Sequence, residues 1–418
     1  MAQRVVLLRR LLTWSIWAFI CLTVNAEVLS TPMPSQNNVS NVDTTVSPTV
    51  RFHAWGGSAQ VNGYIRWLAK QLAQKHNIAL QHVKLADTSD AVSRVLAEKA
   101  AGNSSEGSVD LIWINGENFA TMKKHGLLTP NWVGELPSFA LTSPNENPAM
   151  TTDFGESTLG MEAPWGKASM VFYIRQSHFH QAALTPPSNL EEILAFTQQS
   201  PGRFTYPTPS DYLGISFLKY ALLQLNPQHR DLFYQPVTEQ ALSKTLPSLW
   251  AFLDALHPNM WRQGKMMVRQ ASQLQRLMSS GELSMAFSFT AAEIPSAVER
   301  FDLPTDIRTY AMKDGSLANV HFIGLTFNSP NKQAAKDVVN FMLSPQAQAE
   351  KQKLTVWGDD TVLDMRRLSE AQKRMFDEPL SHPSALDKSV AVPLLGEPHS
   401  SWTDALRDAW YSQYGARY

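Results

Sequence analysis

The sequence predicts an α/β protein of two lobes, built from mainly parallel sheets with flanking helices and hinge segments. Apolar strands alternate with amphipathic helices in the first third of the chain, and this order requires right-handed crossovers between parallel strands. At 418 residues and 44% hydrophobic content, the chain is too large for one ordinary hydrophobic core. Two cores, each with its own sheet, are therefore expected.

The N-terminal segment is typical of an exported protein. Residues 1–26 resemble a secretory signal peptide, because basic residues precede an uncharged apolar run and the segment ends in Val-Asn-Ala. The run covers residues 11–24, whereas a membrane span needs roughly 20 apolar residues, which favours cleavage over anchoring. Cys21 is the only cysteine, so the mature protein is expected to lack disulfides and to diffuse freely in the periplasm.

Residues 27–48 are rich in Ser, Thr, Asn and Pro, and we interpret them as a flexible linker. Three strand and helix units are expected to follow, each recognised by an apolar strand and then by apolar residues at helical spacing. The expected strands are 50–54, 78–85 and 109–114, and the helices that follow them include 65–73, 90–101 and 118–128.

Residues 131–162 show little periodicity and predict a long surface connection, after which the chain changes lobe. Further strands are expected at 169–175, 283–289 and 320–327, and helices at 190–197, 215–225, 246–257, 270–279, 334–342, from 345 and at 402–414. The predicted organisation is a first lobe from 49–164, a second lobe from 165–300, a return to the first lobe over 301–365 and a C-terminal helical segment over 366–418.

The charge and motif content exclude several function classes. The formal net charge of -1 gives no basic surface for nucleic acid, which favours a small or neutral partner. No G-x-S-x-G, H-E-x-x-H, phosphate-loop or G-x-G-x-x-G motif is present. Ser216 and Lys219 match a Ser-x-x-Lys pattern whose companion motifs are missing, and His178 and His180, expected on one side of a strand, lack a third zinc ligand. No catalytic residue, metal or cofactor is expected.

Polar and aromatic residues gather where the predicted strands end, which is where open α/β sheets bind ligands. The backbone N–H groups of Gly56, Gly57 and Ser58 suit an anionic or hydroxyl group, but the same residues could simply form a tight turn. Glu117 and Asp211 could be charge partners for a ligand that stacks on tryptophan or tyrosine. The candidate ligand-binding residues are Trp55, Gly56, Gly57, Ser58, Asn115, Gly116, Glu117, Asn118, Trp165, Gly166, Asp211, Tyr212, Ser288 and Thr290.

Each candidate also has a structural interpretation. Asn115 and Gly116 could only turn the chain while Glu117 or Asn118 caps the following helix. Any single tryptophan could belong to the core, although flanking glycines favour ligand contact for Trp55 and Trp165. Trp113 lies on an apolar strand and is assigned to the core.

Five segments together resemble a known family. They are FHAWGGSAQVNGYI at 52–65, VDLIWINGENFATMKKHGLL at 109–128, APWGKASMVFYI at 163–174, PGRFTYP at 201–207 and FNSPNKQAAKDVVNFMLSPQAQA at 327–349. These segments are similar to the periplasmic solute-binding proteins of ABC importers, type II, a group that includes thiamine, polyamine and iron binders. The likeness is greatest to the YnjB-type branch.

The resemblance implies a type II periplasmic-binding-protein fold with a small solute, thiamine-like or polyamine-like, held in a cleft between the lobes. It also implies a monomer that delivers this solute to an inner-membrane permease driven by a cytoplasmic ATPase. The alternative from the residues alone is a secreted hydrolase with Asp211 and Glu117 as acid and base. A third hypothesis, a sensor that docks on a membrane receptor, differs only in its partner.

Overall fold

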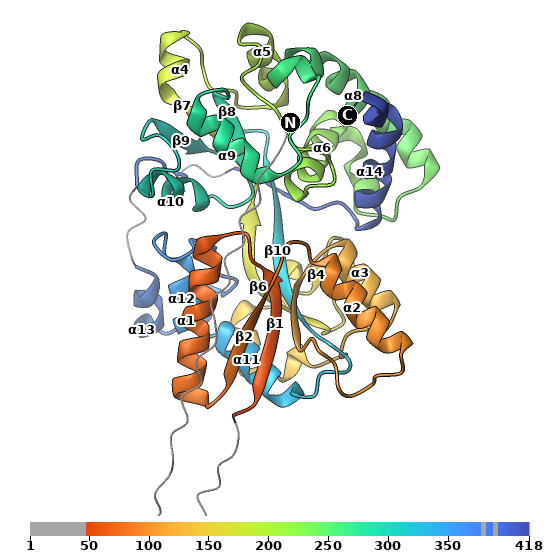
Figure 1. Cartoon of the computed structure of the whole chain (residues 1–418), viewed down its shortest axis with the longest axis vertical. Helices are drawn as coiled ribbons and strands as arrows, with labels where there is room; N and C mark the ends of the chain where they lie inside the picture. The colour runs from red at the N-terminus through yellow and green to blue at the C-terminus, as the bar shows by residue number, and fades with distance from the viewer. Residues whose placement is uncertain (1–46, 378–381, 388–391, 418) are drawn as a thin grey trace, which may run out of the picture. The chain divides into compact units, whose positions relative to one another are not determined.

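The computed structural model describes residues 47–377, 382–387 and 392–417 (Figure 1). The predicted signal peptide, Cys21 and nearly all of the predicted linker lie outside the described residues. Among the residues that are described, no helix combines the length and apolar character needed to cross a membrane.

The first lobe is built on a six-stranded sheet in the order β11-β10-β3-β1-β2, with β6 also paired to β10. Its strands are β1 (Thr49–Trp55), β2 (Ala79–Leu85), β3 (Leu111–Ile114), β6 (Glu162–Ser169), β10 (Ser316–Leu325) and β11 (Leu394–Gly396). Pairing is parallel between β1 and β2, β1 and β3, and β10 and β11. It is antiparallel where β10 meets β3 and β6.

Helices cover both faces of this sheet (Figure 1). On one face lie α1 (Ala59–His76), α11 (Lys332–Met342) and α12 (Pro345–Gln352), and on the other lie α2 (Ser89–Ala100) and α3 (Glu117–Lys124). Alternate residues of β1, such as Phe52, pack with Ile65 and Leu68 of α1 in one core cluster. Ile112 of β3 packs with Val95 and Met122 on the opposite face. The expected strand and helix units are therefore present.

The expected surface connection at 131–162 carries more structure than its sequence suggests. It contains η1 (Val133–Glu135), η2 (Pro137–Thr142), η3 (Pro148–Met150) and a hairpin of β4 (Thr152–Asp153) and β5 (Glu156–Ser157). Trp132 and Met150 are buried in the core of the first lobe. Single apolar anchors of this kind leave no periodic pattern in a sequence.

The second lobe contains a three-stranded sheet in the order β8-β7-β9. Its strands are β7 (Val171–Arg175), β8 (Met285–Ser288) and β9 (Ile307–Tyr310), and both pairings are antiparallel. The expectation of mainly parallel sheets is therefore wrong for this lobe. β7 is the strand that brings the chain into the second lobe, and β10 is the strand that brings it back into the first. β7 runs antiparallel to β8 and β9, and β10 runs antiparallel to β3 and β6.

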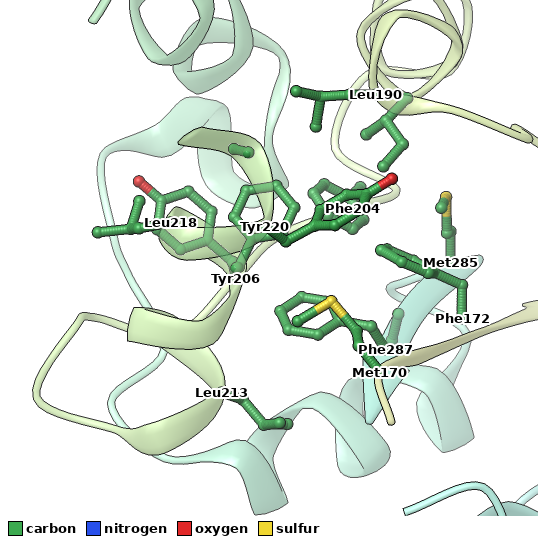
Figure 2. Packing of buried hydrophobic residues seen from close by; sticks show 14 of the residues in the cluster. Met170, Phe172, Leu190, Phe204, Tyr206, Leu213, Leu218, Tyr220, Met285 and Phe287 are labelled. Atoms are coloured by element: carbon green, nitrogen blue, oxygen red, sulfur yellow. The ribbon is translucent and has the colours of Figure 1, made fainter. Parts of the chain in front are cut away.

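Helices surround this smaller sheet and bury a large apolar core. They are α4 (Gln176–Gln181), α5 (Leu190–Gln199), α6 (Tyr212–Leu225), α7 (Arg230–Phe233), α8 (Glu239–Leu256), α9 (Ala271–Ser280) and α10 (Glu293–Glu299). Figure 2 shows Phe172, Phe204, Tyr220 and Phe287 gathered in this core. His178 and His180 lie in α4 and not on a strand, because the strand before them ends at Arg175.

The C-terminal part of the chain touches both lobes. After α13 (Glu370–Lys373), β11 joins the larger sheet and α14 (Ser401–Tyr414) buries Trp402, Leu406 and Trp410 in the core of the second lobe. The stretch 301–365, expected to return to the first lobe, still contributes β9 to the smaller sheet, so the return starts with β10.

Candidate functional site

A cavity of about 1040 Å³ is lined by residues of both lobes. Its wall includes the N-terminal ends of α1, α2 and α3 from the first lobe and of α6, α9 and α10 from the second. Such helix ends present free backbone N–H groups and a positive dipole end. Four of them place an acidic residue on the wall, namely Asp87, Glu117, Asp211 and Glu293.

Most of the candidate residues proposed from the sequence lie on this wall. They are Trp55, Gly57, Ser58, Asn115, Glu117, Asn118, Asp211, Tyr212, Ser288 and Thr290. Gly56 and Gly116 are the chain neighbours of wall residues and do not line the cavity themselves. Whether the wall residues bind a solute stays a prediction.

The turn after β3 holds Asn115, Glu117 and Asn118 at the cavity, and the conformation and hydrogen bond of Gly116 fix this turn. Gly116 has φ +61°, and its backbone N–H donates to Oδ2 of Asp153 over 2.7 Å. A Cβ at Gly116 would lie 2.6 Å from the ring of Phe154, so only glycine fits this position. The structure gives α3 a glycine N-cap without a side-chain hydrogen bond, so Glu117 and Asn118 do not cap this helix.

The loop after β1 presents a tryptophan face to the cavity. Trp55 is 42% exposed, and its indole ring packs on the backbone of Gly57, where a Cβ would clash with the ring. Ser58 caps α1 by accepting a hydrogen bond from the Val61 N–H over 3.4 Å. The Gly56 N–H donates to the Leu85 carbonyl over 2.9 Å and is therefore not free for a ligand, whereas Gly57 and Ser58 line the cavity. Binding of a solute by their N–H groups stays a prediction.

Trp165 is part of an aromatic core and does not reach the cavity. Its side chain is fully buried, and its ring lies 5.0 Å from that of Trp113 and 5.2 Å from that of Trp357. The assignment of Trp165 to the ligand site is therefore wrong. Trp113, assigned to the core, is half-buried and lines the cavity together with Trp357. Trp113 therefore lines the cavity and Trp165 lies in the core, the reverse of the prediction, because β3 and β6 present different faces to the site.

Gly166 provides room for a buried ionic network and not for a ligand. A Cβ there would clash with Asp359 and His321. Asp359 pairs with His321 over 3.1 Å and with Lys351, whose Nζ also donates to the Trp165 carbonyl over 2.9 Å. Burial opposes ionisation of Asp359, but its partners His321 and Lys351 lower the pKa of its carboxyl. Asp359 and His321 are cavity-wall residues that the sequence did not single out as a pair.

Asp211 and Tyr212 begin α6 and have different roles. Asp211 caps the helix by accepting from Leu213 N–H, and its second oxygen accepts from Ala271 N–H, both over 2.9 Å. Burial raises the pKa of this carboxyl, which those N–H donors partly offset. Tyr212 is 42% exposed, receives a hydrogen bond from Asn319 and packs edge-on against Phe289 at 5.3 Å. Tyr212 can therefore offer a ring to a ligand, whereas Asp211 is occupied as a helix cap.

The polar groups at Ser288 and Thr290 surround a carboxylate that sequence reasoning missed. Ser288 accepts from the Thr290 N–H over 3.1 Å and donates to Oε2 of Glu293 over 2.8 Å. Gln275 donates to Oε1 of Glu293 over 2.6 Å. Burial raises the pKa of Glu293, and these two hydrogen bonds oppose the rise. The available signal was an acidic residue in the first turn of a helix that directly follows a strand end.

The hydrolase hypothesis loses its acid and base pair in this geometry. Asp211 is engaged by backbone N–H groups, and Glu117 lies 3.5 Å from the guanidinium of Arg407 on α14. A general acid needs a carboxyl that is free to exchange its proton with the substrate. Asp211 does not meet that requirement, and Glu117 would have to give up its contact with Arg407 to do so.

The comparisons with known proteins agree with this arrangement. Protein YnjB from Escherichia coli (strain K12) is 36% identical over 367 residues, which cover 88% of this chain and 91% of that protein. Two solved structures share the fold, each with a TM-score of 0.60. AfuA from Actinobacillus pleuropneumoniae is 13% identical over 87% of this chain and 98% of its own, and PotD from Streptococcus pneumoniae is 14% identical over 89% and 99%.

The two-lobed type II periplasmic-binding-protein fold, expected from the resemblance, is thus confirmed. A family model described as bacterial extracellular solute-binding protein matches residues 67–359. That match confirms the prediction of a solute-binding protein and not an enzyme. Nothing in the comparisons supports a hydrolase. The chain belongs to the family of bacterial extracellular solute-binding proteins.

Proposed function

We propose that this protein is the periplasmic substrate-binding component of an ABC importer and acts as a monomer. In this proposal it captures one small solute in the cavity between its lobes and delivers it to an inner-membrane permease with a cytoplasmic ATPase. The residue ranges predicted for the signal peptide and the linker form part of the same proposal, as do the lobes, with the return to the first lobe placed at β10.

One observation carries the proposal furthest: a half-exposed aromatic ring faces the cavity from each lobe. Trp55 comes from the first lobe and Tyr212 from the second, and each is 42% exposed. Large apolar side chains are normally buried, so rings exposed on opposite walls of one cavity favour a ligand placed between them. Closing the lobes on the solute would bury both rings.

The neighbours in structure suggest which solutes to test. One is named as a spermidine/putrescine-binding protein, and another was solved with fructose-6-phosphate bound. The chemistry of these two ligands differs in charge, so a first panel needs cationic, anionic and neutral solutes. Thiamine belongs in the panel because of the resemblance found in the sequence.

The test is a thermal unfolding screen of the mature protein, starting at Glu27, with mass spectrometry of any solute that co-purifies. A solute that binds the folded state at 100 times its Kd should stabilise the protein by about 2.7 kcal/mol. Trp55→Ala and Tyr212→Ala should each raise the Kd for that solute at least about tenfold. A stacked ring contributes up to roughly 1.5 kcal/mol beyond the effect of its buried area.

Tyr411→Ala is a matched control, because Tyr411 is 40% exposed on α14 and does not line the cavity. The Tyr411→Ala variant should bind the solute with an unchanged Kd. A protein that neither carries a solute nor responds to any class in the panel would contradict the proposal.

A further inference from the structure

The carboxylates on the cavity wall differ in what already satisfies them. Asp359 is held by Lys351 and His321, and Asp302 pairs with Arg300 over 2.9 Å. Other wall carboxylates are engaged as well: Asp87 accepts from Ser89 N–H, Asp211 from two backbone N–H groups, and Glu117 faces Arg407. These groups neutralise helix ends or cations of the protein itself.

Glu293 differs from them. Its two hydrogen bonds come from Ser288 and Gln275, which are neutral side chains. Among the ion pairs of the described residues, none involves Glu293, although the charge of Arg300 on the same wall helps to lower the pKa of its carboxyl. A carboxylate has about four acceptor positions, so two of them remain for another donor. The residue as a whole is half-buried and lines the cavity, and its carboxyl has lost most of its hydration.

The surroundings of Glu293 suit an organic cation. Phe287 and Phe289 line the same wall, and the half-exposed ring of Tyr212 packs against Phe289 at 5.3 Å. Aromatic faces attract ammonium groups, and a desolvated carboxylate gains most from a charged donor. A phosphate or carboxylate placed here would meet the charge of Glu293 at short range. The positive end of α10 does not reverse this, because Glu293 is itself the acidic residue of the first turn.

Building on the function proposed above, we propose that the solute of this protein carries a protonated amine and that Glu293 receives this ammonium group in the cavity. Ser288 and Gln275 hold the carboxylate in position, and the aromatic wall beside it covers the carbon chain next to the charge. Glu293 is thereby the residue that determines selectivity for cationic solutes over neutral and anionic ones.

The experiment measures Kd by isothermal titration for amines and for neutral molecules of the same shape. Putrescine is paired with 1,4-butanediol, and phenethylamine with 2-phenylethanol; succinate and glucose 6-phosphate represent anions. At least one amine should bind the unaltered protein about thirtyfold or more tightly than its neutral counterpart, as expected when a charge pair replaces an uncharged contact. This comparison needs no variant.

Glu293→Gln should abolish most of that preference and weaken the amine about thirtyfold, while the unfolding temperature shows whether the variant is folded. Glu299→Gln is the matched control, since Glu299 lies on the same helix as Glu293 but is exposed and does not line the cavity, and it should change the Kd less than about twofold.

Tight binding of the anions or the neutral probes, with no preference for amines, would overturn the proposal and leave the solute-binding function intact. An amine preference that survives Glu293→Gln would equally overturn the role of this residue. Failure of every probe, with no co-purified solute, would instead count against the proposed function.

Discussion

Replacing Lys351 by methionine should destabilise the protein by several kcal/mol, because it removes the lysine that pairs with the buried carboxylate of Asp359. Lys351 is fully buried and donates to Asp359, to the Trp165 carbonyl over 2.9 Å and to the Asp360 carbonyl over 3.2 Å. Removing one member of a buried ion pair costs about 3 to 5 kcal/mol, whereas domains are commonly stable by only 5 to 15 kcal/mol. Methionine keeps most of the apolar volume, so little of the loss should come from packing.

The assay is urea unfolding at pH 7, followed by tryptophan fluorescence, since Trp165 and Trp357 lie beside the network. Lys373→Met is the control: Lys373 pairs with Glu370 over 2.7 Å on the surface, where the loss should stay below about 1 kcal/mol. Adding Asp359→Asn to Lys351→Met should recover part of the stability, because the buried carboxylate that lost its lysine partner is then uncharged. A loss of less than about 1 kcal/mol for Lys351→Met would refute the reasoning.

Three further predictions concern two buried titratable groups and one ion pair. Burial lowers the pKa of His53 to about 4, so stability should fall as pH drops from 6.5 towards 4, where the unfolded chain binds the proton first; His53→Gln should flatten this part of a pH series of urea midpoints. Glu162 is buried with no hydrogen-bond partner on either oxygen, and burial raises its pKa. Its protonated form favours folding below about pH 4.5, and that contribution is lost as pH rises through the folded pKa, so Glu162→Gln should be more stable than the parent at pH 8, with the gap closing on acidification. Glu117→Gln and Arg407→Ala should each shift solute Kd less than about fivefold, and a double-mutant cycle by titration should give a coupling of about 0.2 to 1 kcal/mol, as for other exposed pairs.

The sequence was informative wherever local periodicity decides the structure. Alternating apolar residues predicted β1, and apolar residues at helical spacing predicted α1, because these patterns bury one face of each element. The turn Asn115 to Asn118 was placed at the edge of the sheet for the same reason, since a buried strand that stops at polar residues delivers them to that edge.

Other features depend on contacts that are distant in the sequence. Trp113 and Trp165 both lie on strands with a glycine nearby, and only the pairing of β3 and β6 with β10 determines which ring faces the cavity. Glu293 was missed because the hydrogen bond that it accepts from Gln275 joins two helices that no local pattern relates. Antiparallel pairing in the second lobe depends on where the chain crosses between lobes, which composition does not reveal.

Most of the charge on the cavity wall serves the fold, and this limits what the wall can recognise. Asp211 and Asp87 accept backbone N–H groups at helix starts, so substituting them should alter helix stability before it alters selectivity. The groups that can still contact a solute are the aromatic rings that stay exposed and the carboxylate that can accept further hydrogen bonds. Trp55, Tyr212 and Glu293 meet that description on both walls, whereas the sequence singled out the first two and predicted Glu117 and Asp211 as their charged partners. Separating groups that the fold has already satisfied from those it leaves open is therefore the step that local sequence patterns do not supply.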